Sequence, residues 1–257
     1  MLLAIDVGNT NTVLGLYDNE KLIQHWRTKT DANSTADELI LTFNGLLKDQ
    51  PKVTGISLCS TVPSVLREMR WMLERYFPDT KTVIIEPGTK TGVPIITDNP
   101  KEVGADRIAN SLAVFERHGG PSVVVDFGTS TNFDVVSEKG EFLGGALAPG
   151  IEISLEALAN RAAQLRKVEF VKPRSVIGKN TVEALQSGTI YGFAGQVDGL
   201  VNRITDELAD LYPNSGEVCV IATGGLAPLV LGISETIEFH EPDLTLIGLR
   251  LVHERNA

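Results

Sequence analysis

The sequence predicts an α/β protein made of two similar lobes. The main observation is a repeated pattern, "LLAIDVGNTNTVLGLYDNEKL" from Leu2 and "SVVVDFGTSTNFDVVSEKGEF" from Ser122. Each copy has an apolar run, Asp-x-Gly, three small hydroxyl or amide residues, a second run and a charged turn. The 257 residues are also enough for two domains, since domains typically run to roughly 100–200 residues. Helix and strand patterns alternate after each copy. We therefore expect a duplicated module.

The first half predicts a meander of three short antiparallel strands, followed by alternating helices and strands. The strands are expected at Leu2–Val7, Thr12–Tyr17 and Leu22–Arg27, because β-rich runs are separated there by turn residues. Ser34 or Thr35 with Asp37 or Glu38 forms a candidate capping box that opens a helix to about Leu47. The elements expected next are a strand (Gly55–Ser60), an amphipathic helix (Val65–Tyr76), a strand (Thr82–Ile85) and a helix (Ala105–Arg117).

The second half repeats this order. Strands are expected at Ser122–Phe127, Asn132–Val136 and Phe142–Ala146. They are followed by a helix near Ile151–Gln164, a long helix near Val182–Leu211 and a strand at Val218–Ala222. The turn-rich stretch His118-Gly119-Gly120-Pro121 lies just before the second copy. We therefore expect one lobe at residues 1–118 and a duplicated lobe at 119–257.

Composition excludes several classes of partner. Lys and Arg total 23 against 33 Asp and Glu, a net charge of −10, and no dense basic cluster occurs, so we expect no nucleic-acid partner. Cys59 and Cys219 lie in apolar runs without a C-x-x-C motif, so we expect buried, reduced thiols, no structural zinc and a cytoplasmic location. The run Met1–Ile5 ends too early for a signal peptide, and Val218–Ile233 is too short to cross a membrane.

The repeated Asp-x-Gly turns predict phosphate binding. Glycine permits a positive φ and leaves no side chain between backbone and ligand, and the following Asn9-Thr10-Asn11 or Thr129-Ser130-Thr131 offers donors. The aspartate at the strand end is placed to hold a cation. The alternative is that Asp-x-Gly-Asn is simply a hairpin turn, but its occurrence twice favours a site. A third glycine turn, Thr223-Gly224-Gly225, follows the last predicted strand, whereas neither G-x-x-x-x-G-K-[ST] nor G-x-G-x-x-G occurs.

Asp106 is the best candidate for a catalytic base outside the hairpins. It falls in the first turn of the helix predicted from Ala105, beside Arg107. Phosphoryl transfer to an alcohol needs a carboxylate within hydrogen-bond reach of the acceptor hydroxyl. The alternative is that Asp106 only interacts favourably with the helix dipole, and the sequence alone leaves both open.

Six motifs in order carry a resemblance that spans nearly the whole chain. They are "DVGNTNT" (Asp6–Thr12), "NPKEVGADR" (Asn99–Arg107), "DFGTST" (Asp126–Thr131), "GGALAPG" (Gly144–Gly150), "GKNTVEALQSG" (Gly178–Gly188) and "ATGGLAP" (Ala222–Pro228). With them the chain resembles the type III pantothenate kinases, within the superfamily of actin, sugar kinases and heat-shock ATPases. The resemblance implies two ribonuclease H-like lobes with a cleft between them, across which the two acidic loops face each other.

The resemblance also implies an activity and its residues. The activity is transfer of the ATP γ-phosphate to the primary hydroxyl of pantothenate, the first step towards coenzyme A. Asp106 would be the proton acceptor, Asp126 would hold a monovalent cation, K⁺ or NH₄⁺, and Mg²⁺ would bind near Asp6. ATP would contact Asp6, Val7, Gly8, Asn9, Thr10, Asn11, Thr12, Val13 and Thr129, and pantothenate would contact Gly104, Ala105, Asp106, Arg107 and Thr181. A homodimer is implied, with the long helix at 182–211 as a candidate dimer element.

The sequence departs from the family pattern at two places. Thr97 stands where the family often has tyrosine, and the second hairpin reads Thr129-Ser130-Thr131-Asn132 rather than Thr-Ala-Thr-Thr. Two other functions were considered. A regulator resembling the Bvg accessory factor predicts loss of Asp106 or of a hairpin, and an ATP-driven chaperone needs a substrate-binding domain. Neither feature occurs in the sequence, so a kinase is expected.

Overall fold

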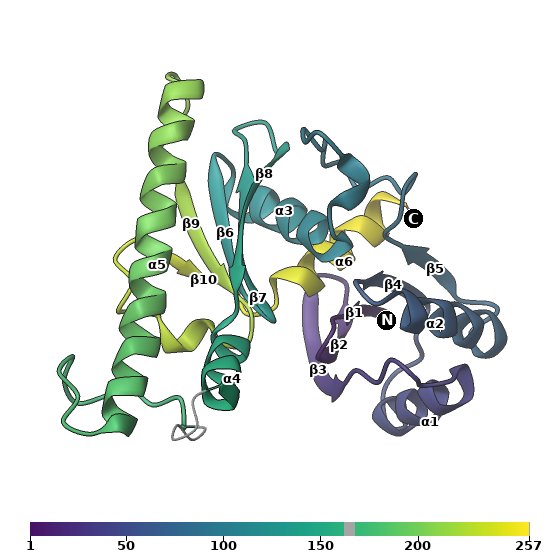
Figure 1. Cartoon of the computed structure of the whole chain (residues 1–257). Helices are drawn as coiled ribbons and strands as arrows, with labels where there is room; N and C mark the ends of the chain where they lie inside the picture. Colours follow the sequence, from purple (N-terminus) through teal and green to yellow (C-terminus); the bar gives the residue numbers. More distant parts are fainter. Residues whose placement is uncertain (162–167, 257) are drawn as a thin grey trace. The chain divides into compact units, whose positions relative to one another are not determined.

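A computed structural model describes residues 1–161 and 168–256 of the chain (Figure 1). The chain forms two compact units. The first contains Met1–Pro94, Asp98–Ala113 and Leu244–Ala257, and the second contains Ile95–Thr97 and Val114–Asp243. The division between them thus falls inside a helix rather than at 118/119, and the C-terminal segment joins the first unit. The sequence-based lobes of 1–118 and 119–257 did not include this return of the chain.

The two units are built on sheets of the same topology. The first sheet has the order β3-β2-β1-β4-β5, and the second has the order β10-β9-β6-β7-β8. In each, the first strand pairs antiparallel with the second strand and parallel with the fourth. The α/β duplication expected from the repeated pattern is therefore confirmed.

The strands of the first sheet lie close to their predicted positions. They are β1 (Leu2–Val7), β2 (Asn11–Asp18), β3 (Lys21–Lys29), β4 (Gly55–Ser60) and β5 (Lys81–Ile84). Side chains of alternating residues on β1 point to opposite faces. Leu3, Ile5 and Val7 point into an apolar core, whereas Ala4 and Asp6 lie on the other face.

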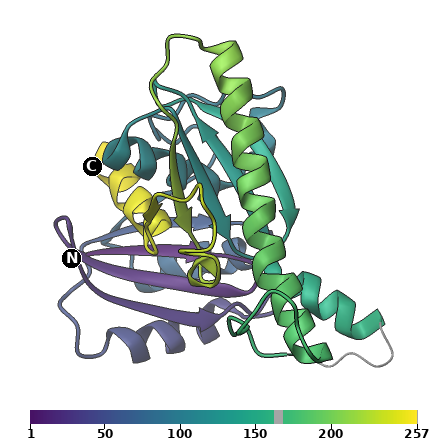
Figure 2. The ribbon, with the colours of Figure 1, turned by 90° about the vertical axis from the view of Figure 1, so that its left-hand side faces the viewer.

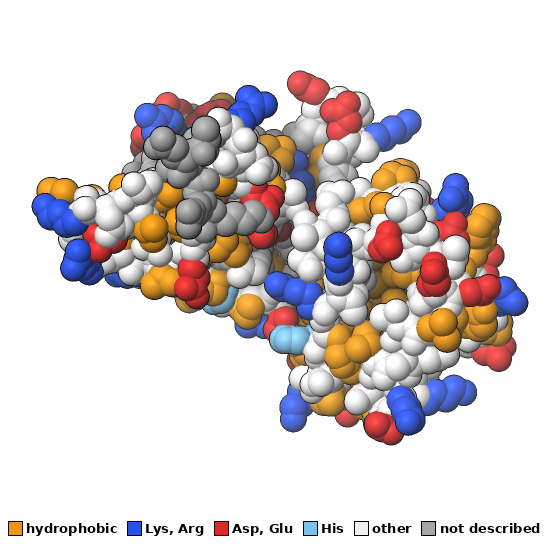
Figure 3. Space-filling view, turned by 60° about the horizontal axis from the view of Figure 1, so that its bottom comes forward, with side chains coloured by type: hydrophobic (Ala, Val, Ile, Leu, Met, Phe, Trp, Pro, Cys, Tyr) orange, Lys and Arg blue, Asp and Glu red, His pale blue; other side chains and the backbone are white. Residues whose placement is uncertain are grey.

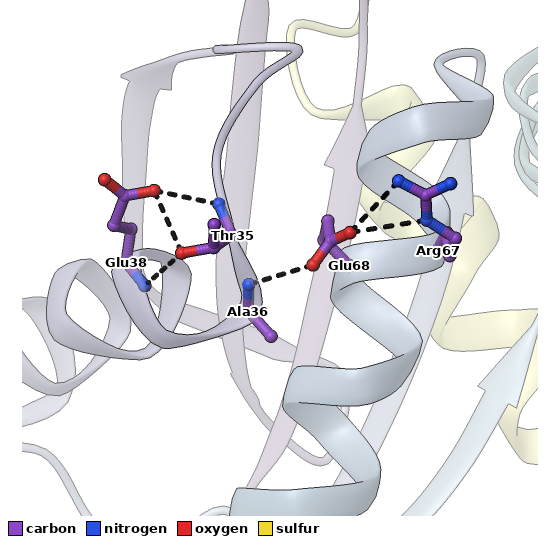
Figure 4. Close-up of polar contacts among 5 residues, drawn as sticks. All are labelled: Thr35, Ala36, Glu38, Arg67 and Glu68. Carbon is purple, nitrogen blue, oxygen red and sulfur yellow. Dashed lines mark hydrogen bonds and ion pairs between the residues drawn. The ribbon is translucent and has the colours of Figure 1, made fainter.

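The apolar face of this sheet is covered by α1 (Ala36–Leu47) and α2 (Pro63–Tyr76). Helix α1 begins with the predicted capping box: the Glu38 N–H donates to Thr35 Oγ1 at 3.3 Å, and the Thr35 N–H donates to Glu38 Oε2 at 2.9 Å. The next N–H, that of Ala36, donates to Glu68 of α2 at 3.2 Å (Figure 4). The first turn of α1 is thereby satisfied by its own cap and by its neighbour.

The second face carries small residues and is covered by α6 (Leu244–Arg255), beside the start of α3 (Ala105–His118). A Cβ at Gly15 would lie 2.8 Å from Leu246 Cδ1, and one at Gly55 would lie 2.6 Å from His253 Nε2. The missing side chains allow α6 to approach the strands. Helix α6 was not predicted from the sequence. A short 3₁₀ helix, η1 (Pro100–Glu102), precedes α3.

The second sheet follows the prediction for β6 (Ser122–Phe127), β7 (Ser130–Val136), β8 (Phe142–Pro149) and β9 (Cys219–Thr223). The two-residue strand β10 (Phe239–His240) and the 3₁₀ helix η2 (Ala227–Leu229) were not predicted. Helix α4 is described over Ile151–Arg161, so its predicted end near Gln164 lies outside the described residues.

Helix α5 (Thr181–Leu211) confirms the predicted long helix and runs along the second sheet (Figure 2). Its residues Ala194, Val197 and Val201 pack into the apolar core of this unit with Val123 and Phe127.

No helix among residues 1–161 and 168–256 is long and apolar enough to span a membrane. On the face drawn in Figure 3, acidic and basic side chains are interspersed, with apolar ones between them.

Candidate active site

The first acidic loop joins β1 to β2 and is closed by its own backbone. The Gly8 N–H donates to Asn11 O at 3.0 Å, which leaves Asn9 and Thr10 exposed at the tip. The loop is tied to the end of β3, because the Thr30 N–H donates to Thr10 O at 3.0 Å and the buried hydroxyls of Thr12 and Thr30 are 2.9 Å apart. The tip is therefore open to a ligand while its base is fixed.

The glycines of the two acidic loops do not use the dihedral freedom of glycine, and only Gly8 is in a sterically tight position. Neither Gly8 nor Gly128 has a positive φ, whereas Gly224, in the third glycine turn, has a φ of +89°. A Cβ at Gly8 would lie 3.1 Å from Asn11 O, so the loop would have to open to admit one. The positive φ that glycine permits is thus not used in either acidic loop.

Asp6 is the second-to-last residue of β1 and lies beside Cys59, its parallel partner on β4. The Cys59 thiol donates to Asp6 Oδ1 at 3.2 Å. Burial raises the pKa of Asp6 from 3.8 to about 7, the negative charge of Asp106 adds to this rise, and the hydrogen bond from Cys59 opposes it. Asp6 is therefore a carboxyl group that gains stability when a cation approaches.

Asp106 lies at the N-terminus of α3, where Gly104 makes room for it. A Cβ at Gly104 would lie 2.5 Å from Asp106 Oδ1. The same oxygen accepts the N–H of Arg107 at 2.9 Å. Burial raises the pKa of Asp106, although the Arg107 N–H and the charge of Arg107 act to lower it. The effect of burial thus outweighs the lowering expected for a carboxylate at a helix N-terminus, and carboxyl groups perturbed in this way are common at functional sites.

Asp6 and Asp106 thus form an acidic pair within the first unit, brought together from the end of β1 and the start of α3. The sequence predicted both residues but contained no sign of their closeness. It also missed the contact of Cys59 with Asp6. The parallel register of β1 and β4 explains that contact, since Asp6 and Cys59 are direct partners. Like charges held together perturb each other's ionisation, as is common at catalytic sites.

The second acidic loop resembles the first but is one residue shorter. Asp6 pairs with Val13, seven positions along the chain, whereas Asp126 pairs with Asn132, six positions along. Here the Gly128 N–H donates to Ser130 O at 3.0 Å, and Gly128 and Thr129 are exposed at the tip. Gly150, the last residue of the "GGALAPG" motif, donates its N–H to Thr129 O at 3.1 Å. That motif therefore supports the loop from the start of α4.

Asp126 lies next to the third glycine turn. A Cβ at Gly224 would lie 2.6 Å from both Asp126 Oδ1 and Phe127 O. Two oxygens, one of them a carboxylate oxygen, therefore converge on a position that only glycine leaves open. Strand β9 thus runs directly into the glycine turn expected from the sequence, within the second unit.

Thr181 is exposed at the first residue of α5. The preceding Asn180 caps the helix by accepting the N–H of Glu183 at 2.9 Å, and Gly178 packs against the first turn, where a Cβ would lie 2.4 Å from Ala184 N. The "GKNT" sequence is thus a capping segment that presents Thr181 to solvent.

No group of three or more His, Cys, Asp or Glu suited to a metal occurs in the described part of the chain.

Solved structures share this fold at low sequence identity. One is described as a putative N-acetylglucosamine kinase from Porphyromonas gingivalis, with a TM-score of 0.54 and 12% identity over 100% of both chains. Another is a ROK hexokinase from Thermus thermophilus, with a TM-score of 0.54 and 15% identity over 99% of both chains. A Baf family transcriptional activator from Campylobacter jejuni has a TM-score of 0.61 and 18% identity over 99% of this chain and 98% of that one. The chain therefore shares its fold with a structural class that includes proteins described as kinases.

Sequence comparison identifies the family within this class. The family model described as type III pantothenate kinase matches residues 2–203. Relatives named type III pantothenate kinase are 65% identical in Frankia alni (100% of both chains) and 61% identical in Streptomyces coelicolor (100% of this chain and 99% of that one). The chain belongs to the type III pantothenate kinase family and is a phosphotransferase. A purely regulatory role is not favoured.

The interaction between the two carboxyl groups can be measured by titration. In Asp106→Asn the pKa of Asp6 is expected to fall below about 7, because one of the charges that raises it is gone. It should stay above 3.8, since burial is the larger cause. Carboxyl ¹³C NMR of protein labelled at aspartate measures this, and Cys59→Val should shift the same pKa upward. An Asp6 pKa that Asp106→Asn leaves unchanged would show that the two groups do not interact.

Proposed function

We propose that Asp106 is the general base in the phosphorylation of pantothenate by ATP, the reaction that names this family and opens coenzyme A synthesis. The observation that carries this role is the acidic pair, in which burial raises the pKa of Asp106 towards the range useful for proton transfer. Asp106 would accept the proton of the primary hydroxyl as the hydroxyl oxygen bonds to the γ-phosphorus and ADP leaves. Gly104, Ala105 and Arg107 beside it, with Thr181, would contact pantothenate.

The first acidic loop is assigned to the phosphates of ATP. Its tip residues Asn9 and Thr10 are exposed, and its base is fixed by the hydrogen bonds of Thr12 and Thr30. Short loops that present N–H groups and hydroxyls suit phosphate oxygens. The ATP contacts would come from Asp6, Val7, Gly8, Asn9, Thr10, Asn11, Thr12 and Val13, with Thr129 from the second acidic loop.

The residues present fit a Mg²⁺ ion near Asp6. Mg²⁺ is usually held by one or two carboxylates together with substrate phosphates and water, and Asp6 supplies such a carboxylate. Its pKa of about 7 means that a bound cation would stabilise the ionised form. When bound, the ion neutralises charge on the phosphates. Phosphoryl transfer otherwise depends mainly on positioning, which the fixed loop and the base at Asp106 provide.

A substitution at Asp106 tests the role of the base. Asp106→Asn keeps the shape of the side chain and its acceptor for the Arg107 N–H but cannot take a proton. We expect kcat to fall about 10²–10⁴-fold, the usual contribution of a general base, with an unchanged circular dichroism spectrum. Asp49→Asn, an exposed aspartate of the same unit, is the control and should leave kcat unchanged. A folded Asp106→Asn enzyme of normal activity would contradict the proposal.

Asp126 is assigned to a monovalent cation, K⁺ or NH₄⁺. Asp126 Oδ1 and Phe127 O converge beside Gly224, and oxygen ligands of this kind suit such ions. We expect activity with K⁺ or NH₄⁺ to be lost when a bulky tetramethylammonium salt replaces them at the same ionic strength. Steady-state assays of ADP release measure this, with Asp126→Asn as the matched variant. Equal activity in the quaternary salt would remove the role of Asp126.

A second copy of the chain is the partner proposed for α5. Gly188, Gly192, Gly195 and Gly199 are spaced by 4, 3 and 4 residues and so share one side of the helix. Cβ atoms at the first three would meet nothing within 4 Å. Each glycine costs a helix about 1 kcal/mol relative to alanine. Among residues 1–161 and 168–256, packing does not require a glycine at the first three positions. Small residues on one side allow a partner helix to approach closely.

The homodimer can be tested by size-exclusion chromatography with light scattering. Gly195→Leu is expected to convert a dimer into a monomer, because the added side chain holds the partner helix away. Gly45→Leu on α1, where a Cβ also meets nothing within 4 Å, should remain dimeric. A Gly195→Leu protein that stays dimeric would contradict this interface.

The location proposed for the protein is the cytoplasm. Both cysteines, Cys59 and Cys219, are free, as is typical of proteins in that compartment.

A further inference from the structure

Helix α6 packs against the first turns of α3 with almost no space between the two backbones. A Cβ at Gly248 would lie 2.1 Å from Ala109 O and 2.5 Å from Ala109 C. These are main-chain atoms that cannot rotate away as a side chain would. Gly248 has no positive φ, so its backbone would accept another residue, and the nearest obstacles to a side chain are main-chain atoms of α3.

A hydrogen bond between α6 and α3 also holds the two helices together at this contact. Thr245, in the first turn of α6, donates its hydroxyl to Asn110 Oδ1 at 2.8 Å. Asn110 is fully buried, as is its neighbour Ala109. The hydrogen bond limits sliding of α3 along α6, while Gly248 determines how close the two helices come.

Helix α6 is held firmly on the sheet, so a side chain added at Gly248 would press on α3. Leu244, Leu249 and Val252 have no exposed surface, and Leu246 packs over Gly15 of β2. Ala109 follows Asp106 by three residues, less than one helical turn of 3.6 residues. A displacement of Ala109 would therefore also displace Asp106. Because Asp6 belongs to β1 and stays with the sheet, the separation of the two carboxyl groups would change.

We infer that Gly248 and Thr245 are positioning residues that set where Asp106 stands relative to Asp6 and the first acidic loop. They contact neither substrate in this assignment and act only through α3. The inference rests on the proposed role of Asp106 as the base. It extends the site to a helix that no sequence motif pointed to.

The test is steady-state kinetics of Gly248→Ala, with KM for each substrate measured separately. We expect kcat to fall about 10–100-fold, since a displacement of about 1 Å from productive geometry can cost 10²-fold. KM for ATP should change less than about threefold, because the first acidic loop lies on β1 and β2 and not on α3. Gly45→Ala adds the same methyl group to an open position on α1 and should leave both constants unchanged.

A double variant separates positioning of the base from general damage. If Gly248 acts through Asp106, then Gly248→Ala should lower the residual activity of Asp106→Asn by less than about twofold, because effects on one functional unit do not add. An equal loss in both backgrounds, or a folded Gly248→Ala enzyme with kcat near that of the wild type, overturns the inference. Normal activity of Asp106→Asn alone overturns instead the proposed base, and the inference with it.

The hydroxyl of Thr245 provides a second measurement if Gly248→Ala does not fold. Thr245→Ser keeps the donor to Asn110 and should retain wild-type kcat, whereas Thr245→Val removes the donor and should lower kcat severalfold with KM for ATP unchanged. Equal kcat values for the Val and Ser variants would overturn the inference.

Discussion

The site depends on holding two carboxyl groups, Asp6 and Asp106, close together in a partly buried place. Burial and mutual repulsion both work against their ionisation, which is why the pKa of Asp6 rises to about 7. The structure offsets this with the Cys59 thiol on Asp6 and the Arg107 N–H on Asp106. A cation near Asp6 and a substrate hydroxyl at Asp106 would offset these effects, so the pair is suited to binding both.

This arrangement follows from the unequal faces of the first sheet. One face is apolar and packs on α1 and α2, as the core of an ordinary α/β module does. The other is lined by small residues such as Ala4, Gly15 and Gly55, and these allow α6 to lie close to the strands. Helix α3 then packs against α6 and brings Asp106 to Asp6. The apolar face therefore forms the core of the first unit, and the other face positions the two carboxyl groups.

The local elements could be predicted because their signals are local. Alternating runs and turn residues located β1 to β4, and the capping box at Thr35 located the start of α1. Helix α6 was missed because Leu244, Leu246, Leu249 and Val252 are buried on more than one side, which hides a helical period. The closeness of Asp6, Asp106 and Cys59 depends on strand register and helix packing, so no short stretch of sequence contains it.

The central claim of the proposed mechanism is that the primary hydroxyl of pantothenate gives its proton to Asp106. The most direct measurement is a crystal structure of the enzyme with pantothenate and a non-hydrolysable ATP analogue. We predict that a carboxylate oxygen of Asp106 lies about 2.6–3.2 Å from the primary hydroxyl, or contacts it through one water. A hydroxyl bound out of reach of Asp106 and facing a different carboxylate would contradict the account.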